Sequence, residues 1–232
     1  MTKQQLVKKC IDLSAAILLL VVLAPLFAVI ALLILVLEGR PVFYVSKRQV
    51  GPKRSIPVLK FRTMVRDALS PKYRLRERFM RGGYLDIPRN CEVYTPIGRI
   101  LERAQIVELP QLLNILLHGM SLIGNRPLPS ENVRCLSQFD GWQERFGSPA
   151  GISGIAQIVG KLNLEPEDRL ALEAAYSEVY QHGNLILCDL LIVWYTLETI
   201  LRGTSTSLEM AISILNRTTA HGRFKLRIKS AV

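Results

Sequence analysis

Residues 13–37 read LSAAILLLVVLAPLFAVIALLILVL and contain no charged side chain. A straight helix of this length would measure about 37 Å, which exceeds the roughly 30 Å thickness of the hydrocarbon core of a bilayer. The run is too long for the apolar part of a signal peptide, and residues 38–41 that follow it offer no small-residue cleavage site. We therefore expect a helix that enters a membrane.

Pro25 stands at the middle of this run and is expected to kink the helix there, because proline removes a backbone hydrogen bond. Lys8 and Lys9 precede the run and Arg40 follows it, and basic residues favour the cytoplasmic side. A re-entrant hairpin with two arms of about 12 residues would keep both basic flanks on that side. A kinked single crossing and a buried helix of a soluble protein are the alternatives. We favour the hairpin and assign it residues 1–40.

The charge of the chain is strongly uneven. The 232 residues carry a net charge of +11, with +10 in residues 38–89, −6 in residues 90–209 and +5 in residues 210–232. An excess of basic residues beside an apolar segment indicates an anionic partner at a membrane surface. The basic zones lack interleaved aromatic residues and any recognised nucleic-acid module, so we expect no nucleic-acid partner.

The four cysteines stand far apart, at positions 10, 91, 135 and 188. They form no C-x-x-C pair, which argues against a zinc ribbon and a disulfide scaffold. We expect reduced thiols in a protein that faces the cytosol.

The remainder of the sequence predicts a small, helix-rich α/β head over residues 41–209, followed by a basic tail over 210–232. Short strands are expected at 41–44 and 56–61, and another after a turn within 149–160. Helical periodicity is expected over residues 64–80, 97–117, 166–180 and 185–201. The last of these helices is very apolar, which fits either a helix lying on a membrane surface or an ordinary core helix.

Two basic segments are candidate anion sites. Lys60, Arg62 and Thr63 alternate with apolar residues at the end of the second predicted strand, and Lys and Arg both suit phosphate. Arg126 stands between Asn125 and a proline, so its backbone is constrained. The alternatives are a solvated strand edge for the first segment and a surface salt bridge for Arg126.

Glu108 is the only acidic residue of an otherwise apolar stretch. Gln111 and Asn114 follow it on roughly one helical face. A partly buried carboxylate in this setting caps a helix, forms an ion pair or binds a divalent cation, and a cation bound together with phosphates needs only one or two carboxylates.

These segments, in this order, resemble the bacterial sugar transferase family of monotopic phosphoglycosyl transferases. The matching elements are KFRTM at Lys60–Met64, ELPQL at Glu108–Leu112, the loop Met120–Pro127, and Gly151–Gly160, which contains Gln157. Arg169, Tyr176 and Asp189 match the helices that follow in the family, and the resemblance covers about residues 8–203.

The resemblance implies a reaction and a location. Such enzymes transfer a sugar 1-phosphate from a nucleotide diphosphate sugar to polyprenyl phosphate, with Mg²⁺, at the cytoplasmic leaflet of the bacterial inner membrane, in the initiation of exopolysaccharide or other glycans. It implies that Glu108 is the metal ligand and a catalytic residue. The residues that it implies bind phosphate or substrate are Lys60, Arg62, Thr63, Arg126, Gln111 and Gln157.

The sequence departs from the family at the catalytic pair. The family has an Asp-Glu pair whose Asp is the covalent nucleophile, and this chain has Val107-Glu108. A valine cannot form a phosphoryl intermediate, and Glu102 also replaces a usual arginine. One hypothesis is that Glu108 takes over as nucleophile. The other is an impaired relative that binds the same ligands and regulates or pairs with an active transferase, or forms a homo-oligomer. Because position 107 is expected at the mouth of the site, Val107→Asp is predicted to be inert or restorative.

Overall fold

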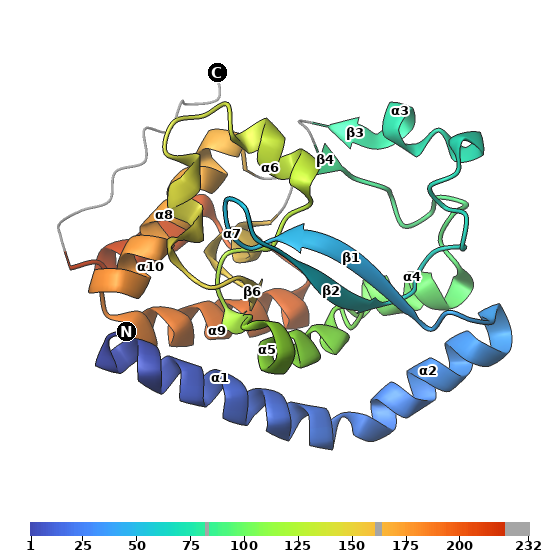
Figure 1. Ribbon diagram of the computed structural model, residues 1–232, viewed down its shortest axis with the longest axis horizontal. Helices are drawn as coiled ribbons and strands as arrows, with labels where there is room; N and C mark the ends of the chain where they lie inside the picture. The colour runs from blue at the N-terminus through green and yellow to red at the C-terminus, as the bar shows by residue number, and fades with distance from the viewer. Residues whose placement is uncertain (82–83, 161–163, 221–232) are drawn as a thin grey trace.

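The computed structural model describes residues 1–81, 84–160 and 164–220. It is rich in helix and has three small sheets of two strands each among these residues, as the predicted α/β class requires. Figure 1 shows α1 (Lys3–Val22) and α2 (Ala24–Glu38) as a bent pair along one side of the molecule, with the rest of the chain packed above them.

The bend between α1 and α2 measures 59° and falls at Leu23. Pro25 lies in the first turn of α2, where its missing N–H breaks no helical hydrogen bond. The predicted kink is confirmed, but the break falls two residues before Pro25, and the helices have 20 and 15 residues instead of about 12 each because α1 begins ahead of the apolar run. Within the described chain no single helix has the length and apolarity to cross a bilayer, whereas the bent pair taken together does.

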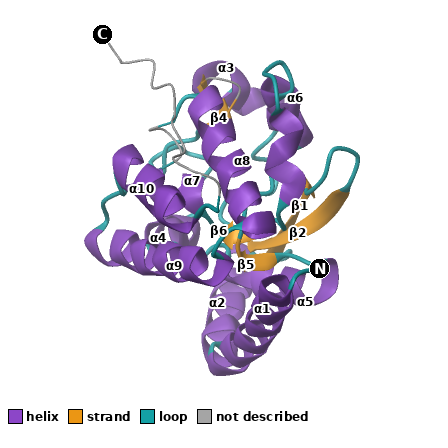
Figure 2. Cartoon of the chain, turned by 90° about the vertical axis from the view of Figure 1, so that its left-hand side faces the viewer, coloured by secondary structure: helices purple, strands orange, loops and turns teal. Residues whose placement is uncertain are grey.

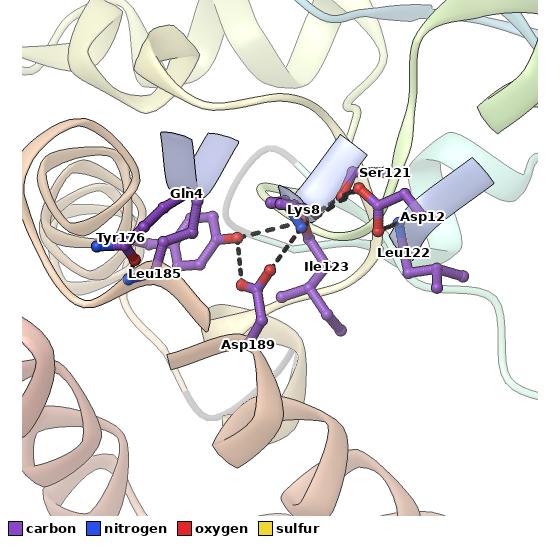
Figure 3. A network of polar contacts seen from close by, with 9 residues as sticks. All are labelled: Gln4, Lys8, Asp12, Ser121, Leu122, Ile123, Tyr176, Leu185 and Asp189. Atoms are coloured by element: carbon purple, nitrogen blue, oxygen red, sulfur yellow. Dashed lines mark hydrogen bonds and ion pairs between the residues drawn. The ribbon is translucent and has the colours of Figure 1, made fainter. Parts of the chain in front are cut away.

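The first half of α1 is fastened to the head by buried polar groups (Figure 3). The Lys8 side chain is 4% exposed, and its ammonium donates to the carboxylate of Asp189 at 2.6 Å and lies 3.4 Å from that of Asp12. Tyr176 donates its hydroxyl to the same Asp189 at 2.7 Å. Asp12 in turn accepts from the Ser121 hydroxyl at 2.7 Å. α1 is thus bound to segments more than a hundred residues away in the sequence.

A β-hairpin follows α2. It consists of β1 (Phe43–Gln49) and β2 (Ser55–Phe61), which pair antiparallel with Tyr44 opposite Lys60 and Arg48 opposite Ile56. The strand predicted at 56–61 is confirmed, while the first strand begins two residues later than predicted and is longer. On β2, Ile56 and Val58 bury their side chains against α1 and α5. Lys60, which follows on the same face of the strand, is therefore directed toward the interior.

Residues 64–80 do not form the predicted helix. They contain only the 3₁₀ helix η1 (Pro71–Tyr73) and the short α3 (Leu75–Phe79), followed by β3 (Met80–Arg81) and β4 (Tyr84–Leu85). Pro71 and the left-handed backbone of Arg74, at φ 46°, interrupt the helical pattern that the periodicity indicated.

The helix predicted over 97–117 is divided into three parts. α4 (Pro96–Arg103) is followed by a turn, the 3₁₀ helix η2 (Leu109–Gln111) and α5 (Leu112–His118). The turn contains Gln105 with φ 56°. Glu108 lies at the end of this turn, directly before η2, and not inside a continuous helix. The direction of its side chain is therefore not set by the helical spacing that the sequence suggested.

Two short parallel strands hold the loop that follows α5. β5 (Ser121–Ile123) pairs with β6 (Gly151–Ser153). α6 (Ser130–Leu136) and the 3₁₀ helix η3 (Trp142–Gly147) lie between the two strands along the chain, and α7 (Ile155–Val159) follows them. A Cβ on Gly124 would lie 2.3 Å from the carbonyl oxygen of Pro149. Only glycine fits there, and this close approach fixes the chain just before Arg126.

Three helices complete the main core. They are α8 (Pro166–His182), α9 (Leu185–Arg202) and α10 (Leu208–Thr218), and α9 lies between the α1–α2 pair and α10 in both views (Figures 1 and 2). The helices predicted at 166–180 and 185–201 are confirmed. Ile192 of α9 is buried in the core, while Trp194 and Leu201 are exposed. The predicted tail boundary at residue 210 falls inside α10, and residues 221–232 of that tail lie outside the described residues.

Candidate functional site

Three of the predicted site residues meet in one ion-pair cluster. The Lys60 ammonium lies 2.5 Å from Oε1 of Glu108. The Arg126 guanidinium donates to both oxygens of the same carboxylate, at 2.5 Å from Nη2 and 3.1 Å from Nη1. A bidentate arginine and a lysine thus share one carboxylate, which is a strong and geometrically defined arrangement.

Backbone contacts bring the three segments together. Phe61, next to Lys60, donates its N–H to the carbonyl of Val107 at 3.1 Å, which places β2 beside Glu108. The Asn114 side chain accepts from Leu59 N–H at 3.0 Å and donates to Pro57 O at 2.6 Å. Asn114 therefore aligns β2 with α5, rather than sharing a face with Glu108 as predicted.

The charges in the cluster shift one another's pKa values. Burial alone would raise the pKa of Glu108, but Arg126 and Lys60 together lower it well below its ordinary range. Glu108 in turn raises the pKa of Arg126. Burial, together with Arg126 and Arg48, lowers the pKa of Lys60, and the ion pair with Glu108 raises it, with a net fall. Because Glu108 has two direct cationic partners, it is a carboxylate at neutral pH.

A second carboxylate, Glu102, stands at the edge of the cluster. It lies in the last turn of α4 and accepts a hydrogen bond from the hydroxyl of Thr63 at 3.3 Å. Burial raises its pKa, Lys60 lowers it and Glu108 raises it, with a net rise. Thr63 thus contacts this second acid instead of offering a free hydroxyl to an anion.

The loop that carries Arg126 rests on a buried polar network. Arg145 donates to the Arg126 carbonyl at 2.9 Å and to the Glu173 carboxylate at 2.6 Å. The Asn125 amide donates to the carbonyls of Arg145 and Glu173, both at 2.8 Å, and to the hydroxyls of Ser148 and Ser177, both at 3.1 Å. This network fixes the backbone on which the Arg126 side chain depends.

Arg62 is not part of the cluster. Its guanidinium donates to the carbonyls of Pro41 at 2.6 Å, Gly39 at 2.6 Å and Glu38 at 3.2 Å. It therefore caps the C-terminal end of α2, where helical carbonyls lack partners and a cation is favoured. The side chain of Arg62, which the resemblance implied binds phosphate, thus makes no described contact with Lys60, Glu108 or Arg126.

Of the other two predicted ligands, Gln111 has a described contact with the cluster and Gln157 has none. Gln111 is buried at the end of η2, and its backbone N–H donates to the carbonyl of Glu108 at 2.9 Å. Gln157, on α7, has a carboxamide without a hydrogen-bond partner among the described residues. A Cβ on Gly154 would lie within 2.8 Å of this carboxamide, and no described contact joins Gln157 to Glu108.

Val107 does not stand at the mouth of the site. Its side chain is 5% exposed and packs with Ile30 and Ile34 of α2, together with Phe61 and Leu101. The expectation of an exposed position is wrong. The turn directs the side chain of Glu108 toward Lys60, and it directs the side chain of Val107 into the apolar cluster between α2 and β2.

Sequence reasoning missed Arg48 of β1. Burial and Arg126 lower its pKa, while Glu108 raises it, so it lies within electrostatic reach of the cluster. In the sequence it was one of many basic residues in a basic segment. Arg48 follows Tyr44 and Ser46 at every second position of a strand that pairs with the strand of Lys60. This alternation was the signal that could have identified it as a site residue.

The described residues contain no group of three or more His, Cys, Asp or Glu side chains able to enclose a metal ion. Glu108, with Glu102 nearby, is a donor set of one or two carboxylates. Such a set fits Mg²⁺ only when phosphate oxygens and water complete the coordination.

Known proteins share this sequence pattern. A family model described as bacterial sugar transferase matches residues 3–203. The exopolysaccharide production protein ExoY of Sinorhizobium fredii is 29% identical over 206 residues, which cover 83% of this chain and 84% of that protein. The undecaprenyl-phosphate glucose phosphotransferase of Komagataeibacter xylinus is 33% identical over 200 residues, covering 82% of this chain and 35% of that protein. The UDP-N-acetylgalactosamine-undecaprenyl-phosphate N-acetylgalactosaminephosphotransferase of Aeromonas hydrophila is 30% identical over 203 residues, covering 85% and 44%.

Proposed function

The chain belongs to the bacterial sugar transferase family, and we propose that it transfers a sugar 1-phosphate from a nucleotide diphosphate sugar to polyprenyl phosphate at the start of exopolysaccharide synthesis. In this reaction the bond between the two phosphates of the donor breaks and a nucleoside monophosphate leaves. A new phosphorus–oxygen bond forms to the acceptor phosphate. The observation that carries the proposal is the cluster of Lys60 and Arg126 around Glu108.

The cluster suits a diphosphate ligand because it has two cations, Lys60 and Arg126, and they share one directly paired carboxylate, that of Glu108. When a diphosphate enters, Lys60 and Arg126 can exchange Glu108 for phosphate oxygens, to which they bind in the same geometry. Glu108 is then released from its ion pairs and becomes available beside the reacting phosphates. Mg²⁺ bound with the diphosphate would be held by Glu108 and would neutralise phosphate charge.

The relatives also favour a transferase over a regulatory relative that only binds the ligands. Two of them are named for sugar phosphate transfer to undecaprenyl phosphate. Val107 offers no nucleophile, so we assign the ionised carboxylate of the site, Glu108, to the transfer step.

We propose further that α1 and α2 form a re-entrant hairpin in the cytoplasmic leaflet of the bacterial inner membrane. The support is the 59° bend and the exposed apolar side chains of both helices. The exposed Trp194 and Leu201 of α9 are suited to the membrane interface. In this arrangement the cluster stands near the level of the lipid headgroups.

Glu108→Gln is expected to reduce nucleoside monophosphate release at least about 100-fold, because the variant lacks the carboxylate that directly contacts both Lys60 and Arg126. The assay supplies UDP-glucose or UDP-N-acetylgalactosamine, undecaprenyl phosphate and Mg²⁺ to the full chain in detergent. Glu131→Gln, which removes an exposed ion pair with Arg76, is the matched control and should keep full activity. No release by the unsubstituted chain with either donor would favour the ligand-binding relative.

The hairpin predicts that cysteines placed at positions 3 and 45 are both cytoplasmic. Lys3 and Val45 are exposed, and the exposed native Cys10 is first replaced by serine. In intact spheroplasts neither position should react with a membrane-impermeant maleimide, and both should react after permeabilisation. Labelling of position 3 alone from outside would establish a single crossing instead.

A further inference from the structure

We infer that Arg48 is a third cation of the site and binds the diphosphate of the donor together with Lys60 and Arg126. This inference rests on the proposed function. It adds a residue from β1, a segment that the sequence motifs leave out.

The strand register places Arg48 on the site side of the hairpin. Tyr44, Ser46 and Arg48 alternate along β1, and Tyr44 lies directly opposite Lys60. Lys47, between Ser46 and Arg48, points to the other face and is exposed, whereas Arg48 is partly buried. The same strand therefore carries one cation toward the cluster and one away from it.

A backbone bridge joins the end of β1 to the loop of Arg126. Gln49 donates its N–H to the carbonyl of Leu128 at 2.8 Å. Gln49 directly follows Arg48, and Leu128 stands two residues after Arg126. This hydrogen bond brings the two arginine-bearing segments side by side. Arg126 lowers the pKa of Arg48 and Glu108 raises it, which agrees with that placement.

The guanidinium of Arg48 is oriented but still able to bind. Its Nε donates to the Ser46 hydroxyl at 2.9 Å, which fixes the plane of the fork. Within the described part of the chain, no carboxylate lies within ion-pair distance of it and its two terminal nitrogens have no hydrogen-bond partner. Three cations thus face a single directly paired carboxylate, Glu108, and a diphosphate supplies the missing negative charge.

The test compares Arg48→Gln with Lys47→Gln by calorimetric titration of the full chain with inorganic pyrophosphate. Both variants lose one positive charge from neighbouring positions of one strand. Arg48→Gln is expected to weaken pyrophosphate binding about tenfold or more, and Lys47→Gln less than about twofold. Arg48→Lys, which keeps the charge and the stem but loses the fork, should fall between the two and serves if the glutamine variant does not fold.

Equal binding by Arg48→Gln and the unsubstituted chain, or an equal loss in Lys47→Gln, would overturn the inference. Nucleoside monophosphate release, measured separately, decides the proposed function. A chain that releases the monophosphate and binds pyrophosphate without regard to Arg48 refutes only the role of this residue. A chain that binds no pyrophosphate also refutes the role of Arg48. If it releases no nucleoside monophosphate either, the proposed transferase function is refuted as well.

Discussion

Replacing Glu173 with glutamine is expected to lower the free energy of unfolding by about 3–5 kcal/mol, because it leaves the Arg145 guanidinium buried without a counter-charge. The two side chains are 1% and 0% exposed and lie 2.6 Å apart. In such surroundings the attraction between the partners offsets a large cost of desolvation, and removing one partner leaves that cost uncompensated. Urea unfolding of the full chain in detergent measures the change.

Two further variants make this result interpretable. Glu131→Gln breaks an exposed ion pair with Arg76 and should cost about 1 kcal/mol or less. Arg145→Met combined with Glu173→Leu removes both charges and should cost less than Glu173→Gln alone, since no unpaired charge remains. A double variant less stable than the single one would contradict this explanation. It would assign the stability instead to the hydrogen bond from Arg145 to the Arg126 carbonyl.

Val107→Asp is expected to lower the free energy of unfolding by about 3–5 kcal/mol and not to increase the release of nucleoside monophosphate. The substitution removes an apolar side chain from the cluster with Ile30, Ile34 and Phe61 and places a carboxyl group there without a partner. Burial would also raise the pKa of the new carboxyl and keep it neutral, which makes it a poor nucleophile.

Val45→Asp is the matched control, because it is the same substitution at a side chain of β1 that is 55% exposed. It should cost about 1 kcal/mol or less. Denaturant unfolding and nucleoside monophosphate release are measured for both variants. A stable Val107→Asp protein with increased release would show that position 107 faces the substrate, contrary to the packing described above.

Long, strongly patterned segments could be predicted from the sequence. The apolar run, the hairpin strand before Arg62 and the helices α8 and α9 all followed from composition and periodicity. The segment 64–80 could not, because its helical period is interrupted by the left-handed backbone of Arg74, which periodicity does not reveal. α10 was also missed, since the basic residues from Arg217 onward suggested a tail, while Ala211 and Leu215 are buried.

The site was predictable where the charged residues of the sequence motifs contact one another in the structure. Lys60, Glu108 and Arg126 came from three separated motifs and do meet. Arg62 belonged to the same motif as Lys60, yet it lies just past the end of β2, where the carbonyls at the end of α2 are nearer than the cluster. Arg48 needed the pairing of β1 with β2, which the sequence alone did not supply.

The ion pair between Lys8 and Asp189 has a consequence for how the protein is made. At a translation rate of about 5–20 residues per second, the ribosome needs roughly 10–40 s to add the residues that separate these two partners. During that interval the nascent α1 exists without Asp189, Tyr176 or Ser121. Its apolar half is therefore expected to enter a lipid bilayer or bind a chaperone first, and the head closes onto it only after Asp189 has been synthesised.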